Sequence, residues 1–596
     1  MRHQAFALDN SSLFFTQLFS DMGDIKLSRR QFFEKMTVPS SGVRVEHLPP
    51  QRATKRPSDD LMSKIDTEFT LSGGLEPYNG PWTKNEAAHL LRRTTFGLKK
   101  AHLDQMLALG NASAAVDAVL NIPTTPPDPP INNYNNPNST PPYADPIVPS
   151  GQTWVNAPPD NEAEGYRIES WRGWWLNRMI EGEANIQEKM TLFWHNHFAT
   201  QTEALFQGRP IYEHHAMLRA NALGNFKDFV KNVTLDRFML VYLNGYLNRV
   251  GAPDENYARE LQELFTVGKE SANTYSEDDV LAAARVLTGW TFNQNGDRIF
   301  VPQLHDLGIK VFSSFYNNTV IQGNANGEAE LDVLLDMIFQ KEEVALFLCR
   351  KLYRYFVYYK IDADVEENVI VPMAQIFRDN NYEILPVIRA LLLSEHFFEA
   401  ANKGCQIKNP LDQVAGLLRN FNLSLPSPTL YDQYFIRLSI NYFCGALQML
   451  PGDPPNVAGW AAYRQVPNFY RTWISSDTIR NRNIITDVMA FVGVDVGPQK
   501  LIIDHVAFAA QFDNPGDPNA LIDDVLFILH PMPISPIKKI FLKSILLSGQ
   551  QSDFYWTDAW NAYVNNPTNP MAYQTVWFRL ASMHKHIMNL AEFQLI

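Results

Sequence analysis

DENYARELQELFTVG, residues 254–268, carries the pattern that decides the fold. Its large apolar residues, Tyr257, Leu261, Leu264 and Phe265, recur with the 3.6-residue period of one face of an α-helix. The same period runs through neighbouring segments at residues 163–181, 185–198, 209–220, 225–235 and 277–288. We therefore predict a helical core unit over residues 162–290.

Helical segments continue on both sides of this unit. On the N-terminal side, Thr83 and Glu86 form a capping box ahead of AAHLLRRTTF, and a second helical stretch is expected over about residues 101–120. On the C-terminal side, helices are expected at residues 328–359, 365–379, 382–400, 409–421 and 477–492. Between them, FNQNGDRIF predicts a short hairpin that turns at Asn295 and Gly296. The predicted fold class is mainly α: a multi-helix globular bundle with a small hairpin insertion near residues 290–312 and long irregular loops.

Breakers and composition divide the chain into three parts. Residues 1–80 carry few periodic apolar positions and several Pro and Gly breakers, which predicts an extended N-terminal arm. Residues 81–490 form the predicted main helical domain. Within it, the Pro- and Asn-rich residues 121–160 are expected to be a surface loop, because proline at that density excludes helix. Residues 491–596 mix short helices with proline turns, and we expect a C-terminal helical subdomain or a cap on the main domain.

Composition and charge exclude several classes of function. The 596 residues are 45% hydrophobic and carry a formal net charge of −13, with no run of Lys and Arg long enough to follow a phosphate backbone. We therefore expect no nucleic-acid partner. No apolar run reaches the roughly 18 residues that a transmembrane helix needs, so no transmembrane segment is expected. The sequence favours no particular oligomeric state.

The N-terminal arm contains a twin-arginine pattern, Arg29 and Arg30 in SRRQFF. Such a pattern directs export when an apolar segment follows it, but MTVPSSGVRVEHLPP follows here. Two localisations therefore stay open. One is export to the periplasm or cell surface by a twin-arginine-like signal, and the other is a cytoplasmic protein in which the arginine pair is a chance occurrence.

The first candidate site is a pair of histidines in QEKMTLFWHNHF, residues 187–198. At 100° per residue, His197 shares the face of Phe193 and is predicted to be buried, whereas His195 points about 160° away. Such a pair binds one metal ion jointly only where the backbone is extended, so joint ligation requires the helix to end at Trp194 or His195. The alternative is a buried, hydrogen-bonded His197 with His195 near the surface.

The second candidate site is a pair of carboxylates on one flank of the helix over residues 254–267. Glu260 and Glu263 lie one turn apart at the edge of the buried face. Two carboxylates in this arrangement suit either a divalent metal or an acid/base pair. The alternative is a structural network in which they pair with arginines such as Arg219, Arg259 or Arg285.

The third candidate is His305 in LHDLGIK, where a His-Asp step beside glycine could supply a metal ligand or a base. The familiar motifs of other chemistries give no support. The sequence contains no P-loop, no GxSxG nucleophile elbow, no HExxH zinc motif and no GxGxxG dinucleotide fingerprint.

Several motifs occur in a fixed order: AAHLLRRTTFG, FWHNHFAT, LRANALGNF, NYARELQELFTVG, YSEDDVLAAARVLTGW, HDLGIK and PPNVAGW. From about residue 83 to residue 490 they resemble the bacterial family catalogued as domain of unknown function 1800. The resemblance implies an all-helical bacterial protein, often with an export signal and often encoded beside a partner of the sulfatase-like family catalogued as domain of unknown function 1501. Leu307 stands where the family more commonly has proline, so the geometry of the HDLGIK loop is expected to differ.

Two functions from different classes are therefore predicted. The first is a metal-assisted hydrolase acting at the cell envelope or on extracellular polymers. Its catalytic residues would be His195, Glu260 and Glu263, and its divalent metal would be bound by His195, His197, Glu260, Glu263 and His305. The alternative is a non-catalytic secreted or envelope module that binds a glycan or a protein partner, served by an aromatic content of 12%. Histidine nitrogens and carboxylate oxygens that converge on one open cavity would favour the hydrolase.

Overall fold

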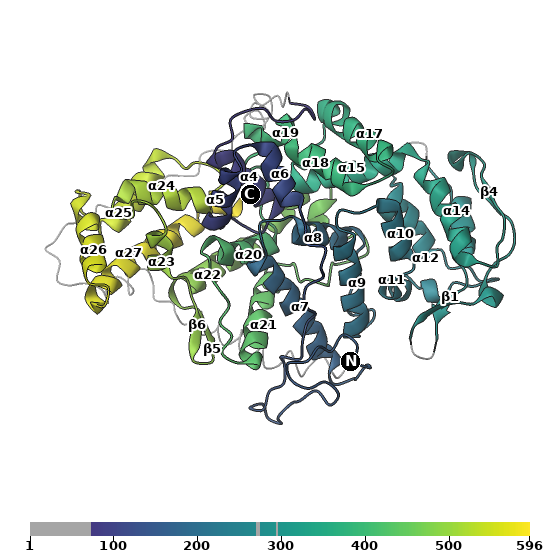
Figure 1. The fold of residues 1–596 in the computed structure, drawn as a ribbon, viewed down its shortest axis with the longest axis horizontal. Coiled ribbons are helices and arrows are strands. Elements are labelled where there is room, and N and C mark those ends of the chain that lie inside the picture. Colours follow the sequence, from purple (N-terminus) through teal and green to yellow (C-terminus); the bar gives the residue numbers. More distant parts are fainter. Residues whose placement is uncertain (1–72, 270–273, 294–295) are drawn as a thin grey trace. The chain divides into compact units, whose positions relative to one another are not determined.

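A computed structural model describes residues 73–269, 274–293 and 296–596 (Figure 1). Thr70–Ile596 forms one compact unit of the chain. Residues 1–72 lie outside the described residues. The extended arm predicted over residues 1–80 therefore stays a prediction for residues 1–72. The export signal suggested by Arg29 and Arg30 also stays a prediction.

The described part of the chain is mainly α, as predicted, and its strands form only three small two-stranded sheets. The first helices are α4 (Lys84–Thr94), α5 (Lys100–Ala108) and α6 (Ala112–Leu120). The helices of the predicted core unit are α7 (Glu164–Glu181), α8 (Gln187–His197), α9 (Gly208–Ala220), α10 (Phe226–Thr234), α11 (Arg237–Tyr242), η1 (Gly245–Leu247), α12 (Asn256–Glu260), η2 (Leu261–Thr266) and α13 (Glu277–Val286).

Local sequence determines where the first helices begin and end. Thr83 and Glu86 make the predicted capping box at the start of α4, with the Asn85 N–H donating to the Thr83 hydroxyl (3.2 Å). The helical stretch predicted over residues 101–120 is present as two helices, α5 and α6, because Gly110, with a φ of +79°, interrupts it. Asn111 then begins α6 by accepting a hydrogen bond from the Ala114 N–H (2.9 Å).

Helix α8 lies in the middle of the helices, beside α9 (Figure 1). All of its residues are buried, including its polar ones. Trp194 fills the space between α8 and α10, with its ring 5.0 Å from that of Phe229, and donates to the Ala222 carbonyl (3.0 Å). Because buried polar side chains need partners, the polar residues of α8 must contact specific groups on the surrounding segments.

The second half of the compact unit is also helical. Its elements are α14 (Gly327–Phe339), α15 (Glu342–Phe356), α16 (Ala363–Val365), η5 (Glu366–Ile370), α17 (Val371–Asp379), α18 (Ile384–Leu393), α19 (Glu395–Phe398), η6 (Ala400–Asn402), α20 (Pro410–Asn420), α21 (Leu430–Ala446), η7 (Ala461–Tyr463), η8 (Phe469–Trp473) and α22 (Ser476–Phe491). The helix predicted over residues 328–359 is two helices, separated at Gln340 and Lys341. Helix α21 has no counterpart among the predicted helices.

The predicted hairpin is present. Strand β1 (Trp290–Phe292) pairs antiparallel with β2 (Arg298–Phe300), and Gly296 in the turn has a φ of +78°. Asn295 lies outside the described residues. After η3 (Pro302–Leu304), a second hairpin is formed by β3 (Lys310–Val311) and β4 (Val320–Ile321), which are connected through η4 (Ser314–Tyr316). A third, formed by β5 (Val494–Val496) and β6 (Gln499–Leu501), follows α22.

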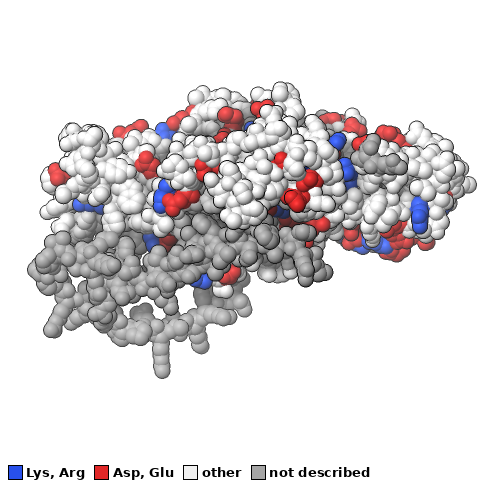
Figure 2. Space-filling model, turned by 90° about the horizontal axis from the view of Figure 1, so that it is seen from below, with Lys and Arg blue, Asp and Glu red and all other residues white. Residues whose placement is uncertain are grey.

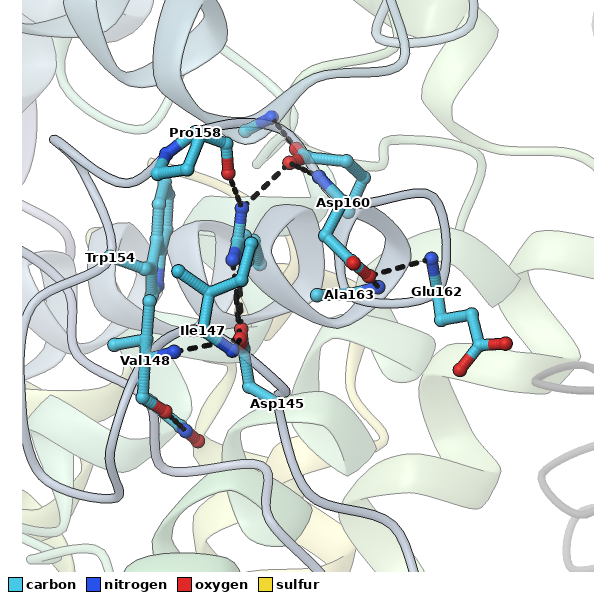
Figure 3. Close-up of polar contacts among 12 residues, drawn as sticks. Asp145, Ile147, Val148, Trp154, Pro158, Asp160, Glu162 and Ala163 are labelled. Carbon is cyan, nitrogen blue, oxygen red and sulfur yellow. Dashed lines mark hydrogen bonds and ion pairs between the residues drawn. The ribbon is translucent and has the colours of Figure 1, made fainter.

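Residues 121–160 form no helix, as their proline content predicts. The segment is nevertheless anchored by the buried Arg167 of α7. Its guanidinium donates to both oxygens of Asp145 (3.1 and 3.3 Å) and to the Pro158 carbonyl (2.9 Å), so that Asp145 and Pro158 converge on it (Figure 3). The Tyr134 hydroxyl also donates to Asp145 (2.7 Å). The segment is therefore a fixed part of the fold and only partly a surface loop.

The last part of the chain returns to the first helix. It consists of α23 (His505–Ala510), α24 (Pro518–Leu529), α25 (Pro536–Leu546), α26 (Phe554–Asn565), α27 (Pro570–Met588) and η9 (Ala591–Gln594). Arg92 of α4 donates to the His530 carbonyl just beyond α24 (2.8 Å), and Ile407 forms an antiparallel bridge with Leu595. The boundary predicted between residues 490 and 491 stays a prediction.

Two observations concern the surface. None of the described helices combines the length and the apolar character needed to cross a membrane. On the face shown in Figure 2, the Lys and Arg side chains of the described residues occur singly and among Asp and Glu. The expectation of no nucleic-acid partner stays a prediction.

Candidate functional site

His195 contacts a loop of the protein. Its Nε2 accepts a hydrogen bond from the Gly452 N–H (3.2 Å), in the loop that leads to PPNVAGW, and its ring packs on Trp175 at 5.3 Å. A ring nitrogen that accepts from a backbone N–H is unprotonated. Burial lowers the pKa of His195 to about 3, which keeps the ring neutral. The prediction of His195 near the surface is wrong, since the residue is only 3% exposed.

The next residue, Asn196, binds the other end of the same loop. Its Oδ1 accepts from the Trp460 N–H (2.8 Å). Gly459 has a φ of +78° and passes so close that a Cβ there would lie 2.3 Å from this oxygen. Arg172 of α7 holds the near end by donating to the Pro451 carbonyl (2.9 Å). The FWHNHFAT and PPNVAGW motifs therefore form one junction.

His197 is buried, as predicted, and contacts a different segment. Its Nδ1 accepts from the Lys351 ammonium (2.9 Å), and its Nε2 lies 3.1 Å from the Phe265 carbonyl. Since an ammonium group only donates, the ring proton sits on Nε2 and is donated to Phe265. Lys351 also donates to the Leu264 carbonyl (3.0 Å). Burial and the charge of Lys351 lower the pKa of His197 well below its usual value.

These carbonyls belong to a distorted helix. Helix α12 continues as the π-helix η2, where the hydrogen bonds span five residues instead of four. Gln262 is fully buried within η2 and accepts from the Tyr316 hydroxyl (2.8 Å). The regular helix predicted over residues 254–267 is therefore distorted in the segment whose carbonyls His197 contacts.

Glu260 and Glu263 lie on the half-buried flank of this helix, as predicted. Glu263 pairs with Lys269 (2.6 Å). Burial, and then the neighbouring charge of Glu263, raise the pKa of Glu260. The three arginines that were considered as partners of Glu260 and Glu263 make their ion pairs with other described residues. These pairs are Arg219 with Glu188, Arg259 with Glu255 and Glu277, and Arg285 with Asp306.

His305 belongs to a third, fully buried group. Its Nε2 lies 3.0 Å from a carboxylate oxygen of Glu330, and its Nδ1 lies 2.8 Å from the Thr288 carbonyl. The same carboxylate accepts from the Lys310 ammonium and from the Asn324 N–H (2.8 Å). Burial alone would raise the pKa of Glu330, but hydrogen bonds from His305 and Lys310 outweigh it and lower the pKa. The HDLGIK motif therefore binds α14 through Glu330.

The predicted metal ligands thus occupy three junctions: His195 at the 451–460 loop, His197 with Glu260 and Glu263 at the α12–η2 helix, and His305 at α14. Among the described residues, no group of three or more His, Cys, Asp and Glu side chains is arranged to hold a metal ion. Joint ligation by the histidines would require them to leave their protein partners. The divalent metal stays a prediction.

A pocket of about 30 Å³ lies where α4, α8, α15, α20 and the η7–η8 segment meet. Several of its lining side chains are half-exposed, so that it reaches the surface. Its polar lining residues are Arg93, Lys189, Arg354, Gln406, Asn409 and Asp412. Cations, a carboxylate and amides thus surround one small space, which matches the composition of a ligand site.

Two of these charges neutralise each other. The Lys189 ammonium donates to Asp412, whose other oxygen accepts from the Asn409 side chain (2.7 Å). Burial lowers the pKa of Lys189, and the charge of Asp412 opposes this effect. Because Lys189 and Asn409 already bind Asp412, its carboxylate is not available to a second cation without a rearrangement.

Within the described part of the chain, Arg93 has no such counter-ion. It is only 3% exposed, and its Nη2 donates to the Asn402 carbonyl (2.8 Å) and to the Cys405 Sγ (3.1 Å). Its Nε and Nη1 are buried and have no acceptor among the described residues. A buried guanidinium with unused donors is costly unless an anion or ordered water binds it.

Aromatic side chains form most of the remaining pocket wall: Tyr355, Tyr359, Tyr463, Phe469, Tyr470 and Trp473. The rings of Tyr359 and Tyr470 lie 5.2 Å apart, edge to face, and both residues are half-exposed. Phe469 has a φ of +43°, which is a strained conformation for an aromatic residue. Such strain is concentrated at functional sites in proteins.

Sequence reasoning missed this pocket, although two of its cations belong to segments already identified. Arg93 lies in AAHLLRRTTFG, and Lys189 lies in QEKMTLFWHNHF. The pattern that could have indicated the pocket is a cation on the otherwise apolar face of a buried helix. The other lining residues come from segments more than 150 positions away, where no local pattern connects them to α4 or α8.

Neither a curated protein nor a solved structure matches the chain. A family model described as "Protein of unknown function (DUF1800)" matches residues 89–595, which include the pocket apart from Ile596, the three histidine junctions and the C-terminal helices. The match extends beyond residue 490, where the motifs that carry the resemblance end. Since it covers most of the chain, the protein belongs to the DUF1800 family.

Proposed function

We propose that the protein is a non-catalytic module that binds a glycan at the pocket around Arg93. The observation that carries the proposal is that one pocket is lined both by half-exposed tyrosine rings and by Arg93, a buried residue with unused hydrogen-bond donors. Sugar rings present apolar C–H faces and hydroxyl groups, and tyrosine offers both an apolar face and a polar hydroxyl. The pocket therefore suits a saccharide.

The size of the pocket determines how such a ligand would bind. About 30 Å³ accommodates roughly two water molecules, so a whole sugar ring does not fit inside. One substituent of the sugar enters, while the ring lies outside against Tyr359 and Tyr470. A ligand held in this way is an oligosaccharide or a chain end with its other residues in solvent.

The proposed site differs from the one expected for a metal-assisted hydrolase. His195, His197 and His305 contact protein groups at separate junctions, so they do not support one open catalytic cavity. A specific observation still favours Glu260 and Glu263 as a second candidate. They are neighbouring carboxylates on a half-buried flank, and burial raises the pKa of Glu260, as expected of an acid/base pair.

Glycan binding can be tested by titrating the full-length protein with neutral and acidic oligosaccharides in a calorimeter. Trp473 in the pocket wall provides a second, fluorescence readout. We expect Tyr470→Ala to weaken binding of the oligosaccharide about tenfold, because it removes one of the two half-exposed tyrosine rings against which the sugar would lie. Tyr573→Ala is the matched control, since Tyr573 is an exposed tyrosine of α27 that does not line the pocket.

Two results would reject the proposal: no binding to any oligosaccharide, or binding that Tyr470→Ala leaves unchanged. Hydrolysis products that disappear in Glu260→Gln would instead favour the second candidate. An envelope or extracellular polymer is the proposed source of the glycan, because the twin-arginine pattern and the sulfatase-like partner that the family resemblance implies both favour it. Fractionation of cells that express the full chain tests this location.

A further inference from the structure

We infer that the glycan is acidic, and that the carboxylate of a uronic-acid type of sugar binds Arg93 in the pocket. The inference rests on the proposed glycan-binding function and specifies the class of its ligand. It is drawn from the charges around the pocket, the unused donors of Arg93 and the volume available to an anion.

The interior beside the pocket holds more positive than negative charge. Three buried guanidinium groups, those of Arg92, Arg93 and Arg482, donate to carbonyl, amide or thiol groups. None of the three forms an ion pair with an Asp or Glu side chain among the described residues. The carboxylate that lines the pocket, Asp412, already binds Lys189 and Asn409. An added anion would therefore lower the electrostatic cost of this region.

Of these cations, Arg93 is the one that lines the pocket and retains unused donors. Its Nη2 is turned toward Asn402 and Cys405, whereas Nε and Nη1 have no acceptor within the described part of the chain. Charge-assisted hydrogen bonds from a guanidinium to a carboxylate are among the strongest that proteins form. The unused donors of Arg93 therefore favour an anionic substituent over a hydroxyl group.

The volume of the pocket limits which anion enters. A space of about 30 Å³ matches a planar carboxylate, which is close in size to two water molecules. The half-exposed rings of Tyr359 and Tyr470 would contact the sugar that carries the carboxylate. Acid recognition and stacking are then performed by different residues of one site.

The decisive experiment compares an oligogalacturonate with its methyl ester, using the unmodified full-length protein and calorimetry. The two ligands share the same sugar rings and differ only in the charge and size of the acid group. We expect the acid to bind about 10- to 100-fold more tightly, which corresponds to the usual value of a hydrogen bond to a charged group. The difference should decrease as salt is added.

Arg93→Lys provides the matched variant, because it keeps the charge but loses the planar array of donors. We expect it to weaken binding of the acid at least about tenfold and to leave binding of the ester nearly unchanged. Arg389→Lys is the control, since Arg389 is an exposed residue paired with Asp117. If Arg93→Lys does not fold, the comparison of acid and ester on the unmodified protein still tests whether the acid group is recognised.

The possible outcomes separate this inference from the function on which it rests. Equal affinity for acid and ester would overturn the inference and leave glycan binding intact. No binding of any oligosaccharide would reject the glycan-binding function, and the acid specificity with it. Tight binding of the acid that is lost in the ester and in Arg93→Lys would support both.

Discussion

His197 joins α8 to the α12–η2 helix through a hydrogen bond to Phe265 and one from Lys351. His197→Ala would leave that carbonyl without its donor and open a cavity in a fully buried helix. We expect the free energy of unfolding to fall by about 2 to 4 kcal/mol, measured by urea denaturation of the full-length protein.

The control is His586→Ala, because His586 is exposed on α27 and its loss should cost less than about 0.5 kcal/mol. Elemental analysis of the same samples tests the alternative role of this residue. A stoichiometric divalent metal in the unmodified protein that disappears in His197→Ala and in Glu263→Gln would contradict a purely structural role. It would support the predicted metal site instead.

Glu330 accepts hydrogen bonds from His305, Lys310 and the Asn324 N–H in a fully buried group. Glu330→Gln removes the negative charge and leaves Lys310 as a buried cation without its counter-ion. We expect a loss of about 3 to 5 kcal/mol in the free energy of unfolding, read from chemical denaturation.

Glu328→Gln is a matched control for this charge removal, since it lies on the same helix in an exposed pair with Lys231. Its effect should stay below about 1 kcal/mol, because surface ion pairs contribute little. Similar effects of the two substitutions would show that the buried group at Glu330 does not stabilise the fold.

At the scale of elements, the loop over residues 451–460 depends on Gly459. Gly459→Ala places a Cβ 2.3 Å from the Asn196 Oδ1 at a φ of +78°, so the loop cannot keep its contact with α8. We expect a destabilisation of about 2 kcal/mol or more, measured as a lower thermal midpoint.

Gly445→Ala is the opposite case. Gly445 lies within α21, and an added Cβ would meet no atom within 4 Å. The substitution should raise the free energy of unfolding by about 0.5 to 1 kcal/mol, because alanine favours helix over glycine. A destabilisation by Gly445→Ala, or none by Gly459→Ala, would contradict these assignments.

Elements could be predicted from the sequence where their determinants are local. The capping box at Thr83, the hairpin at β1 and β2 and the buried face of His197 depend on neighbouring residues, and all three are present. The π-helix η2 and the partners of His195 and His305 depend on segments far along the chain. The histidines were therefore identified as important residues, while their contacts were not predictable.

At the scale of the whole molecule, burial keeps many histidines neutral. The pKa of His195 is lowered to about 3 and those of His505 and His530 to about 4, while His89, His215 and His584 lie well below the usual value of 6.5. In the unfolded chain these rings bind protons near pH 6.5. As the pH falls below about 6.5, the unfolded state therefore binds more protons, and the folded state loses stability.

We expect the free energy of unfolding to decrease between pH 7 and pH 5, by up to about 1.4 kcal/mol per pH unit for each such histidine. Thermal unfolding of the full-length protein over this range measures the effect. A midpoint that is constant from pH 7 to pH 5 would show that these rings do not stay neutral in the folded protein.

The fold class and the family could be predicted at this scale, because helical periodicity and motif order are properties of the sequence itself. The pocket could not. Its walls are assembled from α4, α8, α15, α20 and the segments around residues 406, 469 and 596, and only folding brings them together. The one available indication was that the motifs place Arg93 and Lys189 on buried helices.

The return of the last residues to the first helix also affects the synthesis of the protein. Arg93 leaves the ribosome about 500 residues before Ile596, which at usual translation rates is roughly 25 to 100 seconds. During that interval the nascent chain holds Arg93 on α4 without the pocket walls that the later segments supply. We infer that the pocket is completed only after Ile596 has been synthesised, so that chaperone demand should depend on the last described helices rather than on α4.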